Sequence, residues 1–284
     1  MPRDMPVRMS RRTFIHHTVL LGGLLAGGAS RVLAAPPAPR GRWFSSLVWA
    51  VLENRGYRQV VSLPSHQRLR REGTVLTQYF AVSHPSGPNY RAMASGEIWS
   101  RNEEIGAFHP SIASEASAED IPSYIYHLKG TIARRHNPLR DLRAPVAAEK
   151  HGMAAFTRDL AGGLPSQCLL YCGWDDDNNA HDGPLETADR NVGELLDALA
   201  KSQWFNTPDA LQRYPAFFLC WDEDDDHEDN HVFAAWWGRG VKAGLAAATR
   251  HTHYGFCRTM TENWQLPALG RARSESPVTD PFTA

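Results

Sequence analysis

The 284-residue sequence has little cysteine, no surplus of basic residues and no hydrophobic run long enough to cross a bilayer. Lysine and arginine number 30 against 31 aspartates and glutamates, so nothing in the charge favours nucleic acid as a partner. Four cysteines do not define a disulfide scaffold. Cys168 and Cys172 stand too far apart in an extended run to pair, while Cys220 and Cys257 are either buried thiols or a bridge.

Internal repeats, a coiled-coil register and the G-x-S-x-G elbow of serine hydrolases are also missing from the sequence. These absences disfavour solenoid repeats, long coiled coils and a Ser/His/Asp triad hydrolase. The length is enough for one sizeable domain with a proper core. We expect a single catalytic domain over residues 43–284, preceded by a linker over residues 36–42.

The first 35 residues are typical of an export signal. Several arginines precede an apolar stretch from Thr18 to Ala29, which is too short to span a membrane and is followed by small residues at Ala34 and Ala35. The run SRRTFI from Ser10 resembles a twin-arginine signal, which routes folded proteins through the Tat export machinery. We expect a periplasmic or secreted protein with no stable membrane span after cleavage. The competing interpretation is an uncleaved amphipathic or membrane anchor.

Short apolar runs alternate with amphipathic segments along the rest of the chain. This alternation predicts a three-layer α/β/α sandwich with a largely parallel central sheet. The predicted strands are Leu47 to Leu52, Thr74 to Val82, Gln167 to Cys172, Ala216 to Cys220 and Val232 to Trp237. The predicted helices are Leu63 to Glu72, Ile121 to Arg135, Glu186 to Ser202 and Thr252 to Glu262.

The stretch from Phe80 to Gly96, FAVSHPSGPNYRAMASG, predicts a strand, a tight loop and the start of a helix. Such a junction places a hydroxyl beside unpaired backbone N–H groups at the positive end of a helix, which suits an anion. Ser86 is the candidate hydroxyl, and the alternative is that it only caps the helix.

Polar clusters follow four of these apolar runs: Glu53-Asn54, residues 83–86, residues 175–177 and Asp222-Glu223. Because ligands bind at the carboxyl ends of strands in open α/β sheets, the clusters predict one shared site. Carboxylates and imidazoles form a donor set for divalent metal ions, and a metal beside Ser86 would activate its hydroxyl. The candidate donors are Glu53, Asp222, Glu223, His181 and His253.

The sequence resembles the phosphoesterase family of acid phosphatases and phospholipases C, within the alkaline phosphatase superfamily. The resemblance rests on segments in the family's order across nearly all of residues 43–284. They are VWAVLENRGY at 48–57, FAVSHPSGPNY at 80–90, RRHNP at 134–138, DNNAHDG at 177–183, CWDEDDD at 220–226, NHV at 230–232 and THYGFCRT at 252–259.

The resemblance implies an alkaline phosphatase-like fold and a role for each matched residue. The matched residues, with the role that each would have, are Ser86 as nucleophile; Asn89 and His136 as phosphate ligands; Glu53, Asn54, Asp222, Glu223, Asp177 and His253 as metal ligands; and His181 and His231 as catalytic histidines. Zn, Mn, Mg and Ca all suit these ligands. The chain departs from the family at Trp174-Asp175, which leaves open whether Asp175 or Asp177 enters the site.

Two further motifs favour other functions. The run HEDNH from His227 to His231 spells the H-E-x-x-H of zinc metalloproteases, but its Asp/Asn-rich surroundings are poor in a helix. Residues 175–186 mimic the loop of a calcium-binding module, with Ala180 where glycine is needed.

We therefore predict an exported, metal-dependent phosphoric ester hydrolase that acts on a small phosphorylated substrate through a phosphoserine intermediate. The alternative is a phospholipase C-type phosphodiesterase.

Overall fold

The computed structural model describes residues 40–99 and 108–283. The predicted export signal and residues 36–39 of the predicted linker lie outside the described residues. Within them, an eight-stranded sheet has the order β5-β4-β6-β1-β7-β8-β2-β9. Its strands, in chain order, are β1 (Leu47–Leu52), β2 (Thr74–Leu76), β4 (Ser123–Lys129), β5 (Ala148–His151), β6 (Leu169–Trp174), β7 (Ala216–Trp221), β8 (Ala234–Trp237) and β9 (Leu245–Ala247).

The centre of the sheet is parallel and buried on both faces. β1, with the sequence LVWAVL, pairs in parallel with β6 on one side and β7 on the other. A strand covered on both faces needs a continuous apolar run, and every residue of β1, β6 and β7 is buried. β8 alone runs antiparallel to its neighbours β7 and β2. The three central strands therefore send their carboxyl ends to the same edge of the sheet.

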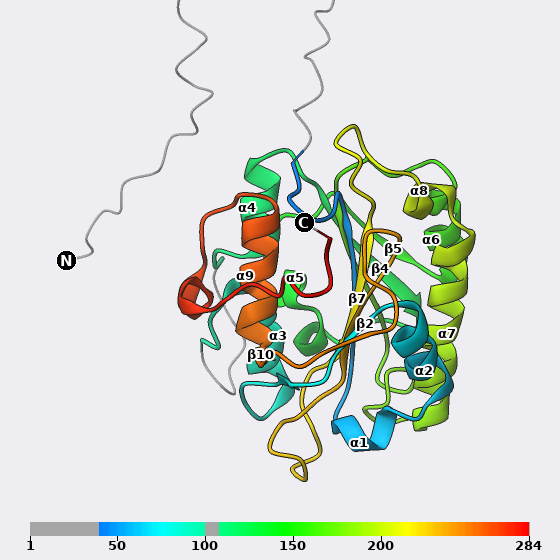
Figure 1. The fold of residues 1–284 in the computed structure, drawn as a ribbon, viewed down its shortest axis with the longest axis vertical. Coiled ribbons are helices and arrows are strands. Elements are labelled where there is room, and N and C mark those ends of the chain that lie inside the picture. Colours follow the sequence, from blue (N-terminus) through cyan, green and yellow to red (C-terminus); the bar gives the residue numbers. More distant parts are fainter. Residues whose placement is uncertain (1–39, 100–107, 284) are drawn as a thin grey trace, which may run out of the picture. The chain divides into compact units, whose positions relative to one another are not determined.

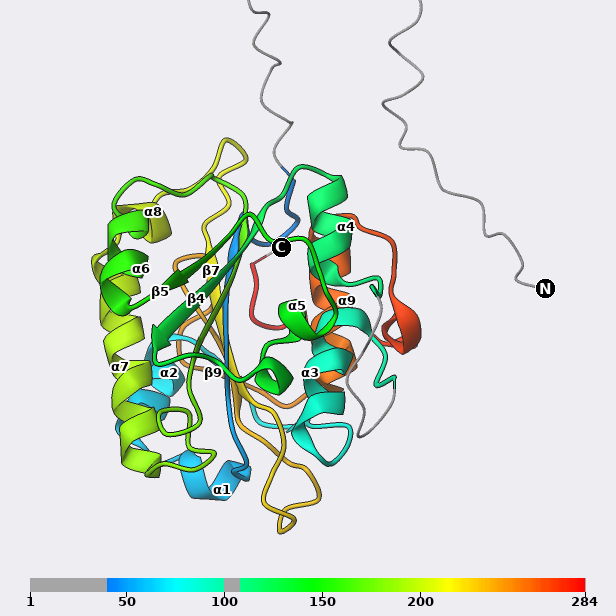
Figure 2. The same cartoon turned by 180° about the vertical axis from the view of Figure 1, so that it is seen from behind.

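Helices cover both faces of the sheet (Figures 1 and 2). One layer contains α2 (Pro64–Glu72), α6 (Met153–Leu160), α7 (Leu185–Lys201) and α8 (Gln203–Asn206). The other contains α3 (Ser86–Ser95), α4 (Ile112–Ala118), α5 (Pro138–Asp141) and α9 (His253–Asn263). The short elements α1 (Tyr57–Val60), η2 (Arg134–His136) and η3 (Gly270–Ser274) lie in connections. The predicted three-layer sandwich with a largely parallel sheet is confirmed.

One predicted helix is wrong. Residues 121–135 form β4 and then the single turn η2 instead of a helix. The strand is rich in aromatic residues, which favour a pleated surface, and it pairs with β5 and β6. Gly130, with φ of +61°, stands just after the end of β4, in a conformation that L residues seldom adopt.

The predicted strand over residues 74–82 is divided in two. Its first part is β2 in the main sheet, and its second is β3 (Tyr79–Phe80), which pairs with β10 (His251–Thr252) in a separate two-stranded sheet. The change of partner turns the chain toward the helical layer that contains α3 and α9. It therefore leads the loop before Ser86 to the carboxyl edge of the main sheet.

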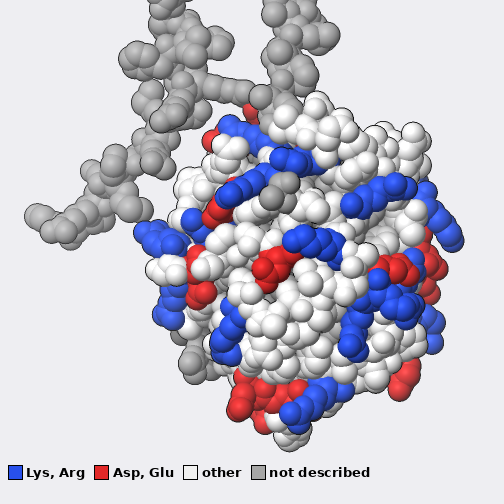
Figure 3. Space-filling view, viewed as in Figure 1, with Lys and Arg blue, Asp and Glu red and all other residues white. Residues whose placement is uncertain are grey.

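The four cysteines are free and buried, and the prediction that Cys168 and Cys172 do not pair with each other is confirmed. Among the described residues, no helix is both long and apolar enough to cross a membrane. Acidic and basic side chains are interspersed over the face of the molecule in Figure 3.

Candidate active site

Two neighbouring strands bring three carboxylates together. Glu53 follows the last residue of β1, and Asp222 and Glu223 follow the last residue of β7. Because Leu52 pairs with Trp221 in parallel register, these acids leave the sheet at the same level. The backbone N–H of Asp222 donates to the carbonyl oxygen of Leu52 at 3.0 Å, which continues the pairing beyond the strands. All three side chains are buried, Glu53 and Asp222 completely.

The hydroxyl of Ser86 lies between two of these carboxylates. Ser86 is the first residue of α3 and is 6% exposed. Its Oγ is 3.1 Å from Oε2 of Glu53 and 2.9 Å from Oε1 of Glu223. A serine hydroxyl has one proton, so it cannot donate to both carboxylates at once. One of the two contacts therefore requires a proton on the carboxyl group or a cation in its place.

The pKa values of the three carboxyl groups also indicate that a proton or a cation belongs in the cluster. Burial, with the charge of Asp222 second, raises the pKa of Glu53 well above its ordinary value and that of Glu223 to about 8. Burial also raises the pKa of Asp222. Removal from water and mutual repulsion both disfavour the charged forms of carboxylates. A divalent cation would offset both costs, so this cluster has the charge of a cation site.

Oδ2 of Asp222 and Nε2 of His136 are buried at the cluster and have no hydrogen-bond partner among the residues that the structure describes. Nδ1 of His136 lies 2.9 Å from a carboxylate oxygen of Asp176, which assigns the proton to Nδ1 and leaves a lone pair on Nε2. Nε2 lies 3.6 Å from Oε2 of Glu53, which is another acceptor. Two acceptors that face each other across a buried gap are the arrangement that a shared cation satisfies.

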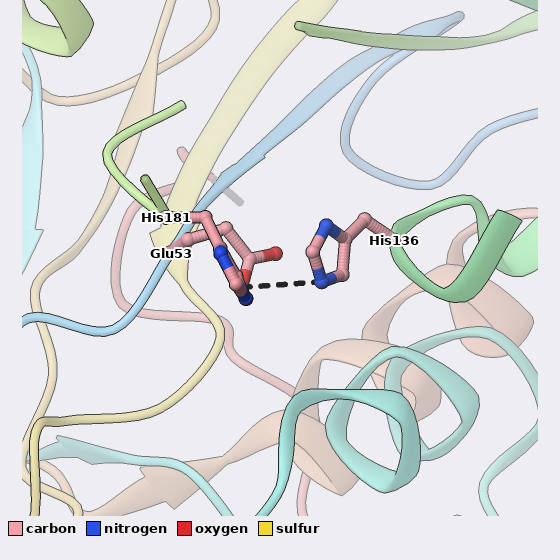
Figure 4. Close-up of side chains that lie close together, drawn as sticks. All are labelled: Glu53, His136 and His181. Atoms are coloured by element: carbon pink, nitrogen blue, oxygen red, sulfur yellow. Dashed lines mark ion pairs between the residues drawn. The ribbon is translucent and has the colours of Figure 1, made fainter. Parts of the chain in front are cut away.

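Figure 4 shows the ring of His136 facing Glu53 and His181 from the opposite side of the site. Ligand atoms of these three residues lie within 4.8 Å of one another. Burial lowers the pKa of His136 to about 4, so the ring is neutral and can act as a ligand. The structure thus offers nitrogen donors next to the carboxylates, and the residues present fit a divalent metal ion.

Several contacts fix the positions of these groups. The backbone N–H of Asn54 donates to Oδ1 of Asp222 at 3.0 Å. The hydroxyl of Tyr90 donates to Oε1 of Glu53, and its ring stacks on that of His136. Tyr90 was not among the predicted site residues, although it stands four residues after Ser86, on the same face of the helix.

Asn89 mainly holds the loop before Ser86. Its side-chain oxygen accepts from the backbone N–H groups of Val82 and Ser83, and its amide donates to the carbonyl oxygen of Ser83 at 2.7 Å. The same amide nitrogen lies 3.4 Å from Oε2 of Glu223, which places it at the border of the site.

Asp177 and His231, which were also predicted as site residues, do not point into the cluster of carboxylates. Asp177 is exposed, and its neighbour Asp176 contacts His136 instead. His231 stacks between Tyr57 and Phe80, and its Nε2 lies 2.9 Å from a backbone carbonyl oxygen.

His253 is buried at the start of α9, and both of its ring nitrogens have partners. Nδ1 contacts the hydroxyl of Tyr79 at 3.1 Å, and Nε2 contacts the carbonyl oxygen of Asp222 at 2.6 Å. Burial lowers its pKa to about 4. This geometry supports the backbone of Asp222 and does not present a ligand nitrogen.

A further histidine, His84, stands at the mouth of the site. Its Nδ1 lies 2.8 Å from Oε2 of Glu223, while Nε2 approaches Asp224 and Asp226 at 3.3 and 3.4 Å. Its place two residues before Ser86 was the signal that could have identified it. Asp176 had no comparable signal, because three consecutive aspartates are equivalent in the sequence.

The first alternative motif lies in a loop, and the second runs from a turn into the start of α7. Residues 227–231 are not helical, and the carboxylate of Glu228 accepts from the backbone N–H of Arg58. The two histidines therefore do not share the helical face that a zinc protease requires. In the stretch that resembles a calcium loop, Oδ1 of Asp175 accepts from Asn178, and Asp177 is exposed.

No family model matches the chain. The chain is 30% identical over 277 residues to the phosphate-repressible acid phosphatase of Penicillium chrysogenum, a match that covers 86% of this chain and 65% of that protein. It is 28% identical over 285 residues to the phosphatidylinositol-3-phosphatase of Mycobacterium tuberculosis, with 92% and 91% covered. It thus spans a little less than two thirds of the fungal relative and most of the bacterial one.

A solved structure of an alkaline phosphatase superfamily protein from Vibrio parahaemolyticus superposes with a TM-score of 0.64, over 86% of this chain and 72% of that one, at 15% identity. The predicted alkaline phosphatase-like fold is therefore confirmed. Both of these sequence relatives are named as phosphatases. The chain is also 24% identical over 256 residues to an acid phosphatase of Aspergillus fumigatus, with 79% of this chain and 55% of that protein covered.

Proposed function

We propose that the protein is an exported, metal-dependent phosphoric monoester hydrolase that acts through a phosphoserine intermediate. The observation that carries the proposal is the contact of the Ser86 hydroxyl with both Glu53 and Glu223 in a buried cluster of three carboxylates. The similarity to named acid phosphatases supports phosphoric esters as the substrate class.

The metal site would be formed by Glu53, Asn54, Asp222 and Glu223, with His136 and His181 facing it. Zinc, manganese, magnesium and calcium remain the candidate ions. Once bound, the ion would lower the pKa of the serine hydroxyl and offset charge on the phosphoryl group. The unpartnered atoms of Asp222 and His136 support this assignment, because each is a buried acceptor with an unused lone pair.

In the proposed reaction, Ser86 Oγ attacks phosphorus and its proton passes to one of the adjacent glutamates. The P–O bond to the leaving group breaks, and the leaving oxygen takes a proton from a histidine. Of the two predicted catalytic histidines, His181 has the supporting geometry, since it faces Glu53 whereas His231 contacts a backbone carbonyl oxygen. Water then attacks the phosphoserine while the same histidine takes up one of its protons. The bond between phosphorus and Ser86 Oγ breaks, Ser86 takes back its proton from the glutamate, and inorganic phosphate is released.

Two roles are weaker in this proposal than the resemblance implies. Asn89 contributes to phosphate binding only through the amide nitrogen near Glu223, because its other contacts hold the loop. Asp177 and His253 do not enter the proposed metal site, since the first is exposed and the second has both nitrogens engaged.

The site is compatible with a second activity, that of a phospholipase C-type phosphodiesterase. The Mycobacterium tuberculosis relative is named as a phosphatidylinositol-3-phosphatase, so lipids are a second candidate class of substrate. A monoester and a diester with the same aryl leaving group separate the two activities. Turnover of the diester at a rate comparable with that of the monoester would favour the diesterase.

Export is proposed from residues 1–35, with the Tat machinery as the partner. Expression of the full chain in a bacterial host with and without a functional Tat translocase tests this step. Periplasmic, shortened protein only in the Tat-competent host is the expected result.

The decisive experiment compares the wild type with Ser86→Ala. Removal of a covalent nucleophile lowers kcat by about a thousandfold or more. Ser86→Ala should keep the far-ultraviolet circular dichroism of the wild type, and chelation should abolish wild-type turnover until a divalent ion is restored. Retention of most of the turnover by Ser86→Ala would contradict the nucleophile assignment, whereas chelator-resistant turnover would contradict metal dependence.

A further inference from the structure

An open cavity of about 530 Å³ lies next to the candidate active site, where β4 leads into η2 and α5. The residues of its lining that matter here are His127, Arg134, Asn137, Arg140, Arg143 and Glu149. Three of these side chains are guanidinium groups and only one is a carboxylate.

The single acid in the lining is already engaged. Oε1 of Glu149 lies 2.6 Å from Nε2 of His127, and Oε2 accepts from Arg140. Nδ1 of His127 accepts from the backbone N–H of Ile132 at 2.9 Å, so the ring carries its proton on Nε2 and is neutral. The guanidinium of Arg143 has no hydrogen-bond or ion-pair partner among residues 40–99 and 108–283. Arg140 is paired with Glu149, so the guanidinium of Arg143 is the group in the lining that remains available to an anion.

The segment over residues 134–137 belongs to both the cavity and the active site. Arg134 and Asn137 line the cavity. Between them, Arg135 and His136 both contact Asp176, and His136 faces Glu53. One turn of chain thus separates the cavity from the proposed metal site.

We propose that this arginine cavity binds a second anionic group of the substrate, so that the enzyme prefers phosphoesters that carry another phosphate or a carboxylate. The proposal rests on the proposed function, because it places the reacting phosphate at Ser86. The guanidinium group presents a planar fork of donors that matches the oxygens of phosphate and carboxylate. Such an anion would provide the partner that Arg143 lacks.

The test uses straight-chain diol bisphosphates of increasing length, each beside the monophosphate of the same diol. The wild type should prefer the bisphosphate in kcat/KM at one spacer length, and added salt should reduce this preference because the cavity is open to solvent. Phosphorylated hydroxy acids of the same lengths distinguish a carboxylate from a phosphate as the second group.

Arg143→Gln is the test variant. It should lower kcat/KM for the preferred bisphosphate by about tenfold, which corresponds to the loss of one charge-assisted contact. The rate on the monophosphate should stay within about twofold of the wild-type rate, because Arg143 does not contact the active-site residues. The matched control is Arg190→Gln, an exposed arginine on α7 that donates to Thr187.

Two outcomes would overturn the proposal: no preference for any bisphosphate or phosphorylated hydroxy acid, or an equal loss on both substrates in Arg143→Gln. The second would mean that Arg143 supports the fold around His136. Calorimetric binding of the bisphosphate to Ser86→Ala, with and without Arg143→Gln, separates this result from failure of the proposed function. Binding that depends on Arg143 in a chain that hydrolyses no phosphoester would refute only the hydrolase.

Discussion

Glu223→Gln should make the metal-free protein more stable at alkaline pH while it abolishes turnover. In the folded chain, burial and the charge of Asp222 raise the pKa of Glu223 from an ordinary value of 4.5 to about 8. The unfolded chain releases this proton near pH 4.5, whereas the folded chain retains it to about pH 8. The folded state thus binds more protons across this window, so its stability falls as the pH rises through it.

The magnitude follows from the size of the pKa change. Each tenfold change in proton affinity corresponds to about 1.4 kcal/mol, which sets an upper limit of about 5 kcal/mol for the full change. Solvent reaches part of the Glu223 carboxylate and screens its interactions, so we expect about 2 kcal/mol. Glutamine has nearly the same shape and cannot ionise, so it removes this penalty at pH 8 and changes little near pH 4.5.

The assay is urea denaturation of chelator-treated protein at several pH values, followed by tryptophan fluorescence. Glu223→Gln should flatten the decline in the free energy of unfolding between pH 4.5 and pH 8. Glu194→Gln, which alters an exposed acid on α7, is the control and should leave the slope unchanged. Excess divalent ion should reverse the order, because ligand that binds only the folded state adds stability in proportion to its affinity.

The reasoning would be refuted by a variant that keeps the wild-type slope in chelator. It would also be refuted if Glu223→Gln were less stable than the wild type at pH 8 without metal. Either result would mean that the three carboxylates do not repel one another enough to matter.

Two further predictions concern the scaffold. Asp141→Ala breaks the buried ion pair with Arg91, 2.6 Å long, that joins α5 to α3, and should cost about 3–5 kcal/mol in urea denaturation. The Arg91→Met, Asp141→Leu double variant should recover most of this loss. Burial lowers the pKa of His66, so the unfolded chain takes up a proton that the folded chain refuses, and stability falls below about pH 6.5. His66→Gln should weaken that acid-side decline, and an unchanged decline would assign it to other groups.

The elements that could be predicted from the sequence are those whose burial follows one simple pattern. β1 and β7 are uninterrupted apolar runs because both faces of the central sheet are covered. α7 repeats its apolar residues with the helical period because only one side packs. The helix predicted over residues 121–135 is instead the strand β4 followed by a turn. Its pairing with β5 and β6 decides its structure, and pairing between distant segments is not visible in one window of sequence.

The site residues also fall into those that a local pattern predicts and those that depend on contacts between distant segments. Glu53, Asp222 and Ser86 directly follow buried strands or open a helix, so the topology alone predicts that they meet. Asp176 and His253 depend on the direction in which a loop or a helix end points a side chain. The conformation of the loop exposes Asp177 and directs Asp176 to His136, and the pairing of β3 with β10 brings His253 beneath the backbone of Asp222.

The carboxylates and His136 also differ in how the fold holds them in place. The carboxylates stand at the ends of buried strands, and burial raises the pKa values of all three, with the charge of Asp222 as a second cause for Glu53 and Glu223. His136 lies on a short turn that is held by Asp176 and by the hydroxyl of Tyr171, which donates to its carbonyl oxygen at 2.5 Å. A site with one rigid side and one side tied by hydrogen bonds can adjust to ions of different radius. The choice of metal should therefore depend more on the turn around His136 than on the acids, and Asp176→Asn should alter the relative affinity for zinc and magnesium more than Tyr90→Phe does.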